Sequence, residues 1–249
     1  MGVGHQNKRI GAIIQARYDS SRLPGKVLFN LPFHSEETVL SQIIKRLRSC
    51  NFLDHIIVAT SDQKDDDPIE KEALLRKAEV YRGSKQNVLK RYCHAARKFD
   101  LNVIIRITGD NPIVLTETIE EAVNQHLIKE YDYTTLSSLS LGMNFEIVNL
   151  SALERSLNSN PTDQEKEHVT LYLKNNIEKH NFSEVKLIHN KNSNNIRLTI
   201  DYPSDYALLN LLFTYLEGFN NQYNIENIHG FFNCYPWAIE INKGNKQKT

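Results

Sequence analysis

The sequence has few cysteines and no long apolar run, and both absences narrow the class of protein. Its three cysteines, Cys50, Cys93 and Cys234, lie far apart and form no Cys-x-x-Cys pair. This spacing argues against a structural zinc site and against a disulfide framework. No apolar stretch approaches the roughly 18 residues of a membrane-spanning helix, and the polar segment before Ile10 lacks the apolar core of a signal peptide. We therefore expect a reduced, cytoplasmic protein that has no membrane as a partner.

The sequence also lacks an excess of charge of either sign. Its 30 lysines and arginines balance 30 aspartates and glutamates, so the formal net charge is zero. Because a neutral chain exerts no long-range pull on a polyanion, we expect no nucleic acid as a partner, although zero net charge does not exclude a local basic patch. The 40% hydrophobic and 24% charged residues are typical of a folded globular protein.

Short apolar runs alternate with segments of helical periodicity in the first half of the sequence. Strands are predicted over residues 10–16, 55–60, 79–82 and 103–107, and helices around 39–47, 65–78, 88–99 and 119–127. This alternation predicts βαβ units and an α/β fold with a mostly parallel sheet.

The rhythm changes after about Tyr131. Strands are predicted over 145–148, 185–188 and 196–200, a polar turn over 190–195, and helices from 151 and over 164–175, 205–216 and 227–233. The strands over 185–188 and 196–200 would suit a hairpin or the edge of a mixed sheet.

The loop after the first predicted strand is the first candidate for function, because ligands bind beyond the carboxyl ends of parallel strands. Residues 15–26 include three cations, two serine hydroxyls and a glycine. Arginine, lysine and exposed backbone amides suit a polyphosphate, although an ordinary solvated loop would have the same composition. The patterns GxxxxGK[ST] and GxGxxG are both absent, which excludes a Walker loop and a dinucleotide fingerprint.

Two carboxylates also follow predicted strands. Asp110 comes after the strand over 103–107, and Asp201 follows the strand over 196–200. A carboxylate in such a position can bind Mg²⁺, and it can equally cap a turn. Together with the cationic loop, the two aspartates indicate a metal–triphosphate site and phosphoryl or nucleotidyl transfer.

Several sequence blocks occur in an order typical of one known family. The first is Ile14-Gln15-Ala16-Arg17, which continues through Ser21-Arg22-Leu23-Pro24-Gly25-Lys26. The later blocks are Val58-Ala59-Thr60-Ser61, Tyr81-Arg82-Gly83-Ser84, Val88-Leu89-x-Arg91-Tyr92, residues 106–112, Phe145-Glu146-Ile147, Glu167-His168-Val169-Thr170 and residues 197–205. In this order, the blocks resemble the cytidylyltransferase family, and most closely its SpsF-type branch of spore-coat polysaccharide proteins.

The resemblance implies a Rossmann-like, three-layer α/β nucleotide-diphospho-sugar transferase fold with a mostly parallel mixed sheet. It implies one nucleotidyltransferase domain over residues 1–249, with 131–195 as a smaller acceptor-binding or dimerisation region. The implied reaction is Mg²⁺-dependent: CMP passes from CTP to a sugar acid or a related surface-polysaccharide precursor, and pyrophosphate leaves. The family also leads us to expect a homodimer.

The resemblance further implies roles for individual residues. Arg17, Lys26 and Asp110 are expected to be catalytic, and Lys26 would stabilise charge at the α-phosphate and on the leaving pyrophosphate. The expected nucleotide-binding residues are Gln15, Ala16, Arg17, Ser21, Arg22, Lys26, Arg82, Ser84 and Arg106. The expected metal ligands are Asp110 and Asp201, and the expected acceptor-binding residues are Asn144, Glu146, Glu167 and His168. Asn144 stands where the SpsF-type pattern usually has aspartate, so a nonulosonic acid, an octulosonate and a sugar phosphate all stay open as acceptors.

Two other functions compete with nucleotidyl transfer. A glycosyltransferase would use a ready-made nucleotide sugar and a DxD-like metal motif, for which Asp65-Asp66-Asp67 has the spacing. The same acids also suit the start of a helix, where they complement its dipole. A nucleotide-binding protein without catalysis is the third reading, and the presence of Lys26, Asp110 and Asp201 counts against it.

Overall fold

A seven-stranded mixed sheet forms the centre of the protein. The computed structural model describes residues 8–137, 139–186, 196–220 and 222–247. The strands are β1 Ile10–Gln15, β2 His55–Ser61, β3 Glu79–Gly83, β4 Val103–Thr108, β5 Tyr133–Ser137, β6 Glu146–Asn149 and β7 Phe182–Lys186. Their order across the sheet is β3-β2-β1-β4-β6-β5-β7. β6 runs antiparallel to both of its neighbours, whereas the other pairs are parallel. The predicted fold class is therefore confirmed.

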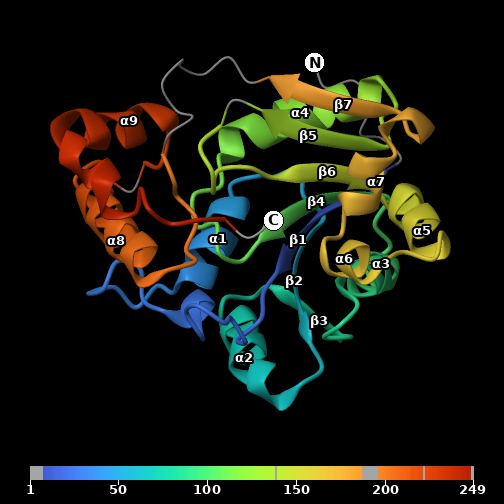
Figure 1. Ribbon diagram of the computed structural model, residues 1–249, viewed down its shortest axis with the longest axis horizontal. Helices are drawn as coiled ribbons and strands as arrows, with labels where there is room; N and C mark the ends of the chain where they lie inside the picture. The colour runs from blue at the N-terminus through green and yellow to red at the C-terminus, as the bar shows by residue number, and fades with distance from the viewer. Residues whose placement is uncertain (1–7, 138, 187–195, 221, 248–249) are drawn as a thin grey trace.

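Helices cover both faces of this sheet (Figure 1). They are α1 Val39–Leu47, α2 Asp67–Leu75, α3 Val88–Lys98, α4 Thr116–Ile128, α5 Leu150–Asn158, α6 Asp163–Glu167, α7 Leu171–Asn175, α8 Pro203–Glu217 and α9 Ile225–Cys234, with 3-10 turns η1 Lys26–Leu28, η2 Lys64–Asp66, η3 Ile177–Lys179 and η5 Pro236–Ile241. No helix in the described ranges is long and apolar enough to cross a membrane.

Two hydrophobic cores make the sheet the middle of three layers. Ile14 belongs to the core that holds residues of α1, α4 and α8, whereas Ile13 belongs to the core that holds residues of α3 and α5. Consecutive residues of a strand face opposite sides of a sheet. Because both side chains are 0% exposed, both faces of the sheet are covered.

A helical lobe lies to one side of the sheet and consists of α8, α9 and η5 (Figure 1). Aromatic rings contact one another in this lobe: the buried Phe231 ring lies 5.5 Å from that of Tyr215 and 5.4 Å from that of Tyr235. After η5 the chain, red in Figure 1, runs back from this lobe toward the middle of the molecule.

The predicted strand over 196–200 is wrong. Leu198 and Ile200 are fully buried, as in a strand, but residue 197 forms only an isolated bridge to Leu141. The backbone amide of Leu198 donates to Leu141 O at 2.6 Å, and that of Ile200 donates to Asp110 O at 2.9 Å. The segment is thus an extended, buried connection, and an apolar pattern alone does not distinguish it from a strand.

Other predictions about the second half needed smaller corrections. The helix predicted over 164–175 is divided into α6 and α7, and β5 was not predicted. β7 covers 182–186 instead of beginning at 185, and pairs in parallel with β5 rather than in a hairpin with 196–200. The predicted turn over 190–195 lies outside the described residues.

Candidate active site

A cleft of about 760 Å³ opens at the carboxyl ends of β1 and β4. β2 lies on one side of β1 in the sheet, and β4 lies on the other side. The strand order therefore reverses at β1, and α/β sheets bind ligands at such a topological switch point. The two strand ends meet closely here, because the Gly109 amide donates to Gln15 O at 2.8 Å. A Cβ at position 109 would lie 2.9 Å from that oxygen, so only glycine fits without a shift of the backbone.

Lys26 lies almost buried at this switch point, with 7% of its surface exposed. Gly25, whose φ of 71° is in the left-handed region, precedes it and starts η1. The Lys26 ammonium donates to Asp110 Oδ2 at 2.9 Å, to Asp201 Oδ1 at 3.0 Å and to Ile200 O at 2.5 Å. The predicted phosphate-binding lysine and both predicted metal ligands therefore meet at one point.

Asp201 is surrounded by cations. Its Oδ1 also lies 2.8 Å from Arg22 Nη2, and its Oδ2 lies 2.8 Å from Arg197 Nη2. Burial alone would raise the pKa of Asp201, but Lys26 and the two guanidinium groups outweigh burial and lower it. The carboxylate is thus held in its charged form, which a metal ligand requires.

A second charge cluster is centred on Glu146. β6 is antiparallel to β4 and places Glu146 directly opposite Arg106, whose Nη1 lies 2.6 Å from Glu146 Oε2. The other oxygen, Oε1, receives Lys174 Nζ at 2.7 Å and the Tyr133 hydroxyl at 2.5 Å, and Thr170 Oγ1 donates to both at 3.1 Å. Burial favours a raised pKa, yet Arg106 and Lys174 dominate and lower the pKa of Glu146 to about 2.

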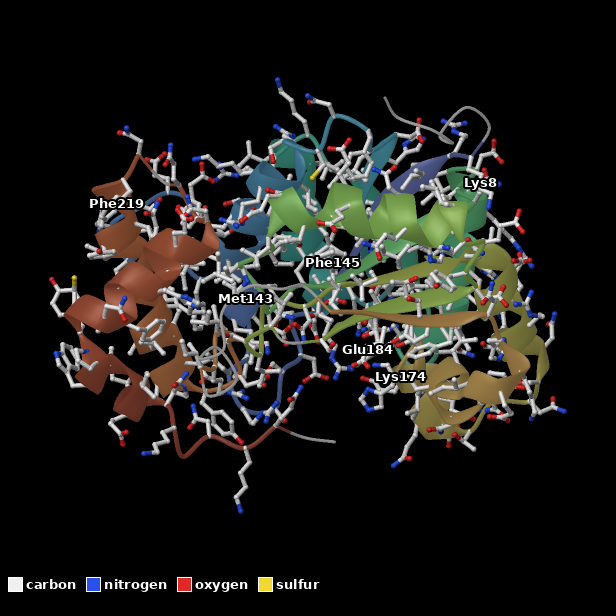
Figure 2. The ribbon with its side chains drawn as sticks, turned by 90° about the horizontal axis from the view of Figure 1, so that it is seen from above. Lys8, Met143, Phe145, Lys174, Glu184 and Phe219 are labelled. Carbon is white, nitrogen blue, oxygen red and sulfur yellow. The ribbon has the colours of Figure 1, made fainter. Side chains whose placement is uncertain are left out.

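Lys174 is the exposed member of the Glu146 cluster, since 48% of its side chain is accessible. It comes from α7 and is labelled in Figure 2, as is Phe145 immediately before β6. Both residues line the cleft together with Arg106. Lys174 therefore adds a cationic group to the lining of the cleft.

Two residues of the acidic run Asp65-Asp66-Asp67 bind other parts of the protein. Asp66, 3% exposed, accepts the backbone amides of Tyr18 at 2.7 Å and Ser61 at 2.9 Å. Asp67 Oδ1 lies 2.6 Å from Arg82 Nη1. Asp66 thus fixes the loop after β1, and Arg82 engages Asp67, which is one of the two acids that a DxD metal motif would need. This ion pair argues against the glycosyltransferase hypothesis.

The structure brings most of the predicted site residues into the one cleft. Those that line it are Gln15, Ala16, Arg17, Lys26, Arg106, Asp110, Asn144, Glu146, Glu167, His168 and Asp201. Arg17 Nη1 lies 3.0 Å from Glu167 Oε1, so the loop after β1 and α6 meet across it. Arg22 lies beside the cleft through Asp201, whereas Ser21 is exposed and does not line it.

Arg82 and Ser84 lie elsewhere. Arg82 is bound by Asp67 and Glu70, and Ser84 lines a separate cavity of about 570 Å³ with Arg91. Their nucleotide-binding role is a prediction that depends on the resemblance alone.

Comparison with known proteins identifies the family of this fold and cleft. Residues 11–229 match the family model described as "Cytidylyltransferase". The chain belongs to the cytidylyltransferase family. Spore coat polysaccharide biosynthesis protein SpsF of Bacillus subtilis (strain 168) is 35% identical over 206 residues, which cover 81% of this chain and 85% of the relative.

Solved structures agree with this membership. A cytidylyltransferase from Leptospira borgpetersenii serovar Hardjo-bovis (strain JB197) superposes with a TM-score of 0.86 at 27% identity, covering 98% of this chain and 100% of the other. A CMP:2-keto-3-deoxy-manno-octonic acid synthetase in complex with CTP has a TM-score of 0.64 at 15% identity, covering 83% and 98%. The second likeness concerns the fold alone.

Four residues in or beside the cytidylyltransferase cleft had no functional role in the sequence analysis, and one of them, Lys174, lines the cleft itself. Arg197 and Asp205 stand in the last family block, but nothing in that block says that Arg197 binds Asp201. Lys174 and Tyr133 carried no motif, and they enter the site only because α7 and β5 pack beside β6. Pairs so distant in sequence have no local signal.

The carboxylates of Asp110 and Asp201 in the cytidylyltransferase cleft have the chemistry to bind a metal ion together with the oxygens of a triphosphate. Within the described ranges, no group of three or more histidine, cysteine, aspartate or glutamate residues could hold a metal alone. Asp110 and Asp201, however, converge on one ammonium at 2.9 and 3.0 Å, which shows that their oxygens can share a cation. Mg²⁺ is usually bound by one or two carboxylates and completed by phosphate oxygens and water.

Proposed function

We propose that this cytidylyltransferase transfers CMP from CTP to a sugar acid or a related surface-polysaccharide precursor, in a Mg²⁺-dependent reaction that releases pyrophosphate. The observation that carries the proposal is the convergence of Asp110 and Asp201 on Lys26 at the switch point of the sheet. This arrangement offers both charge signs that a metal–triphosphate needs within one cleft.

On the nucleotide side, an acceptor oxygen attacks the α-phosphorus of CTP in line, and a hydroxyl acceptor releases its proton to solvent. The bond from that phosphorus to the bridging oxygen of the β-phosphate breaks, and pyrophosphate leaves with the bonding electron pair. Lys26 and Arg17 neutralise charge on the phosphates, while Asp110 and Asp201 hold the metal ion. Bound Mg²⁺ supplies further positive charge at the triphosphate oxygens. Most of the catalysis then comes from positioning and from charge stabilisation.

On the acceptor side, an anionic substrate is favoured by Lys174, which is half-exposed beside Glu146. Arginine and lysine bind carboxylates by charge-assisted hydrogen bonds. The CMP:2-keto-3-deoxy-manno-octonic acid synthetase, which shares the fold, is named for a sugar acid.

The described parts of residues 131–195 supply the acceptor side in this proposal. They contribute Asn144, Glu146, Glu167 and His168 to the cleft. We extend the proposal to a homodimer formed through the same region, and sedimentation equilibrium tests it: a monomer across the working concentration range contradicts it.

Nucleotide binding and turnover test the proposal directly. Calorimetry should show tighter binding of CTP than of ATP, GTP, UTP or a CDP-sugar, and Mg²⁺ should strengthen it. A pyrophosphate-release assay with CTP should then identify the acceptor among nonulosonic acids, octulosonates and sugar phosphates.

A pair of aspartate variants provides the control. Asp110→Ala should abolish turnover and the effect of Mg²⁺ on CTP binding, whereas Asp65→Ala, which alters an exposed residue of the acidic run, should leave both unchanged. Retained activity in Asp110→Ala, or a preference for a nucleotide sugar over every triphosphate, contradicts the proposal.

A further inference from the structure

The segment after η5, residues Asn242–Gln247, folds back onto the catalytic cleft. Asn242 is buried, with 3% of its surface exposed, and Gln247 lines the cleft itself. In Figure 1 this stretch is the red trace that leaves the helical lobe for the centre of the molecule. The family model ends at residue 229, so it does not include this segment.

Two side-chain amides of the segment bind one buried carboxylate. Asn242 Nδ2 donates to Asp205 Oδ1 at 2.9 Å and to the backbone oxygen of Arg197 at 2.9 Å. Asn245 Nδ2 donates to the same Asp205 Oδ1 at 2.8 Å and to Ser204 Oγ at 2.8 Å. Asp205 is 0% exposed, so these amides replace the water that would otherwise solvate its charge.

Asp205 in turn orients the guanidinium that holds the proposed metal ligand. Arg197 Nε and Nη2 lie 2.9 and 3.2 Å from the two oxygens of Asp205. The same Nη2 lies 2.8 Å from Asp201 Oδ2, and the backbone amide of Asp201 donates to Asp205 Oδ2 at 2.9 Å. Asp201 is therefore fixed through both its side chain and its backbone, which leaves Oδ1 directed at Lys26.

The segment also contacts the arginine on the other side of Asp201. The backbone oxygen of Lys246 accepts from Arg22 Nη1 at 3.3 Å and from the Tyr202 hydroxyl at 3.2 Å. The Arg22 guanidinium lies 4.7 Å from the centre of the Tyr202 ring and 2.8 Å from Asp201 Oδ1. Arg22 is thus held between the aromatic ring, the carboxylate and the segment.

We propose that Asn242–Gln247 is a positioning element of the nucleotide site, which sets the orientation of Asp201 and Arg22 toward the metal–triphosphate. The inference rests on the proposed function and deepens it. Partners that orient a metal ligand typically change metal affinity or activity about 10- to 100-fold when they are lost. In this proposal the segment acts through Asp205 and Arg22, and not through contact with the acceptor oxygen or the α-phosphorus of CTP.

Asn245 offers the sharpest test, with calorimetric CTP affinity measured with and without Mg²⁺ as the readout besides turnover. Asn245→Ala should weaken CTP binding about tenfold in the presence of Mg²⁺ and much less in its absence. Asn245→Asp should weaken it further, because a carboxylate then faces Asp205 in place of a donating amide. Asn233→Ala, which removes an exposed asparagine of α9, should match the wild type in affinity, KM for CTP and Tm.

A variant that ends at Lys243 tests the Lys246 contact as well. It should raise KM for CTP more than Asn245→Ala does, because Arg22 loses a partner too. The inference is overturned if Asn245→Ala and the shortened variant bind CTP with Mg²⁺ as the wild type does. It is also overturned if affinity falls equally with and without Mg²⁺ while Tm collapses, since that result indicates a role in folding alone. If the wild type binds CTP with Mg²⁺ but releases no pyrophosphate with any acceptor, the proposed function fails and these affinities still decide the inference.

Discussion

Glu146→Gln is the change that tests the buried charge cluster of the cleft most directly. The substitution keeps the shape of the side chain and removes its charge, which leaves Arg106 buried opposite a neutral group. The fall in the pKa of Glu146 from 4.5 to about 2 corresponds to about 3 kcal/mol of stability at neutral pH. Removal of one partner of a buried ion pair typically costs about 3–5 kcal/mol, which agrees with this magnitude. We expect Glu146→Gln to lower the free energy of unfolding by about 3 kcal/mol at pH 7.

The effect should depend on pH in one direction. A carboxylate whose pKa is lowered in the folded state contributes its stability above the unfolded value of 4.5 and loses it as the pH falls toward about 2. Below that range the wild-type side chain is neutral, as glutamine is. The difference between the two proteins should therefore be constant above pH 5.5 or so and should vanish progressively below about pH 4.5.

Urea unfolding of both proteins at a series of pH values measures this difference. Glu154→Gln is the matched control, because Arg97 Nε lies 2.6 Å from Glu154 Oε1 but 55% of the arginine side chain is exposed. An exposed pair of this kind contributes under about 1 kcal/mol, so the control should change little. A loss below 1 kcal/mol in Glu146→Gln, or one that persists unchanged down to acid pH, would refute the reasoning.

Three further changes test the rest of the cleft. Lys26→Met should lower Tm, because Asp110 and Asp201 lose the cation that they share. Millimolar Mg²⁺ should restore part of that loss. Thermal melts that do not respond to Mg²⁺ would contradict a shared cation site. Asp66→Ala removes the acceptor of the Tyr18 backbone amide and should cost about 2–3 kcal/mol in urea unfolding while raising KM for CTP; an unchanged KM would show that the loop needs no such anchor. Gly109→Ala places a Cβ 2.9 Å from Gln15 O and should cost about 1–3 kcal/mol; unfolding identical to the wild type would mean that the two strand ends separate freely.

The first half of the fold could be predicted because its elements have strong local signals. The helix over 39–47 has the predicted bounds, since Thr38 caps it and its apolar residues recur at helical spacing. β5 gave a weaker signal: Tyr133, Thr134 and Thr135 favour strands, but the segment has no apolar run. Thr134 is nevertheless fully buried, and its hydroxyl lies 2.8 Å from Nδ1 of His126 in α4, a contact that has no local pattern.

The candidate site divides in the same way. Asp110 could be placed at the carboxyl edge of the sheet because it follows β4 by two residues, and Lys26 because it ends the loop that begins after β1. Asp201 reaches the same point from a segment that belongs to no strand, so its strand-end argument was wrong in its premise. The contact between Asn242 and Arg197 spans 45 residues and has no local pattern that could have announced it.

The contact between Lys26 and Asp201 also determines when the site can exist during synthesis. The two residues are 175 positions apart, and ribosomes add about 5–20 residues per second. The ammonium of a nascent chain therefore waits roughly 9 to 35 seconds for that carboxylate to be made, even if β1 and β4 have already paired. A chain still attached to the ribosome can hold most of the sheet and yet have no complete nucleotide site, so the capacity to bind the nucleotide arises only after residue 201 has been added.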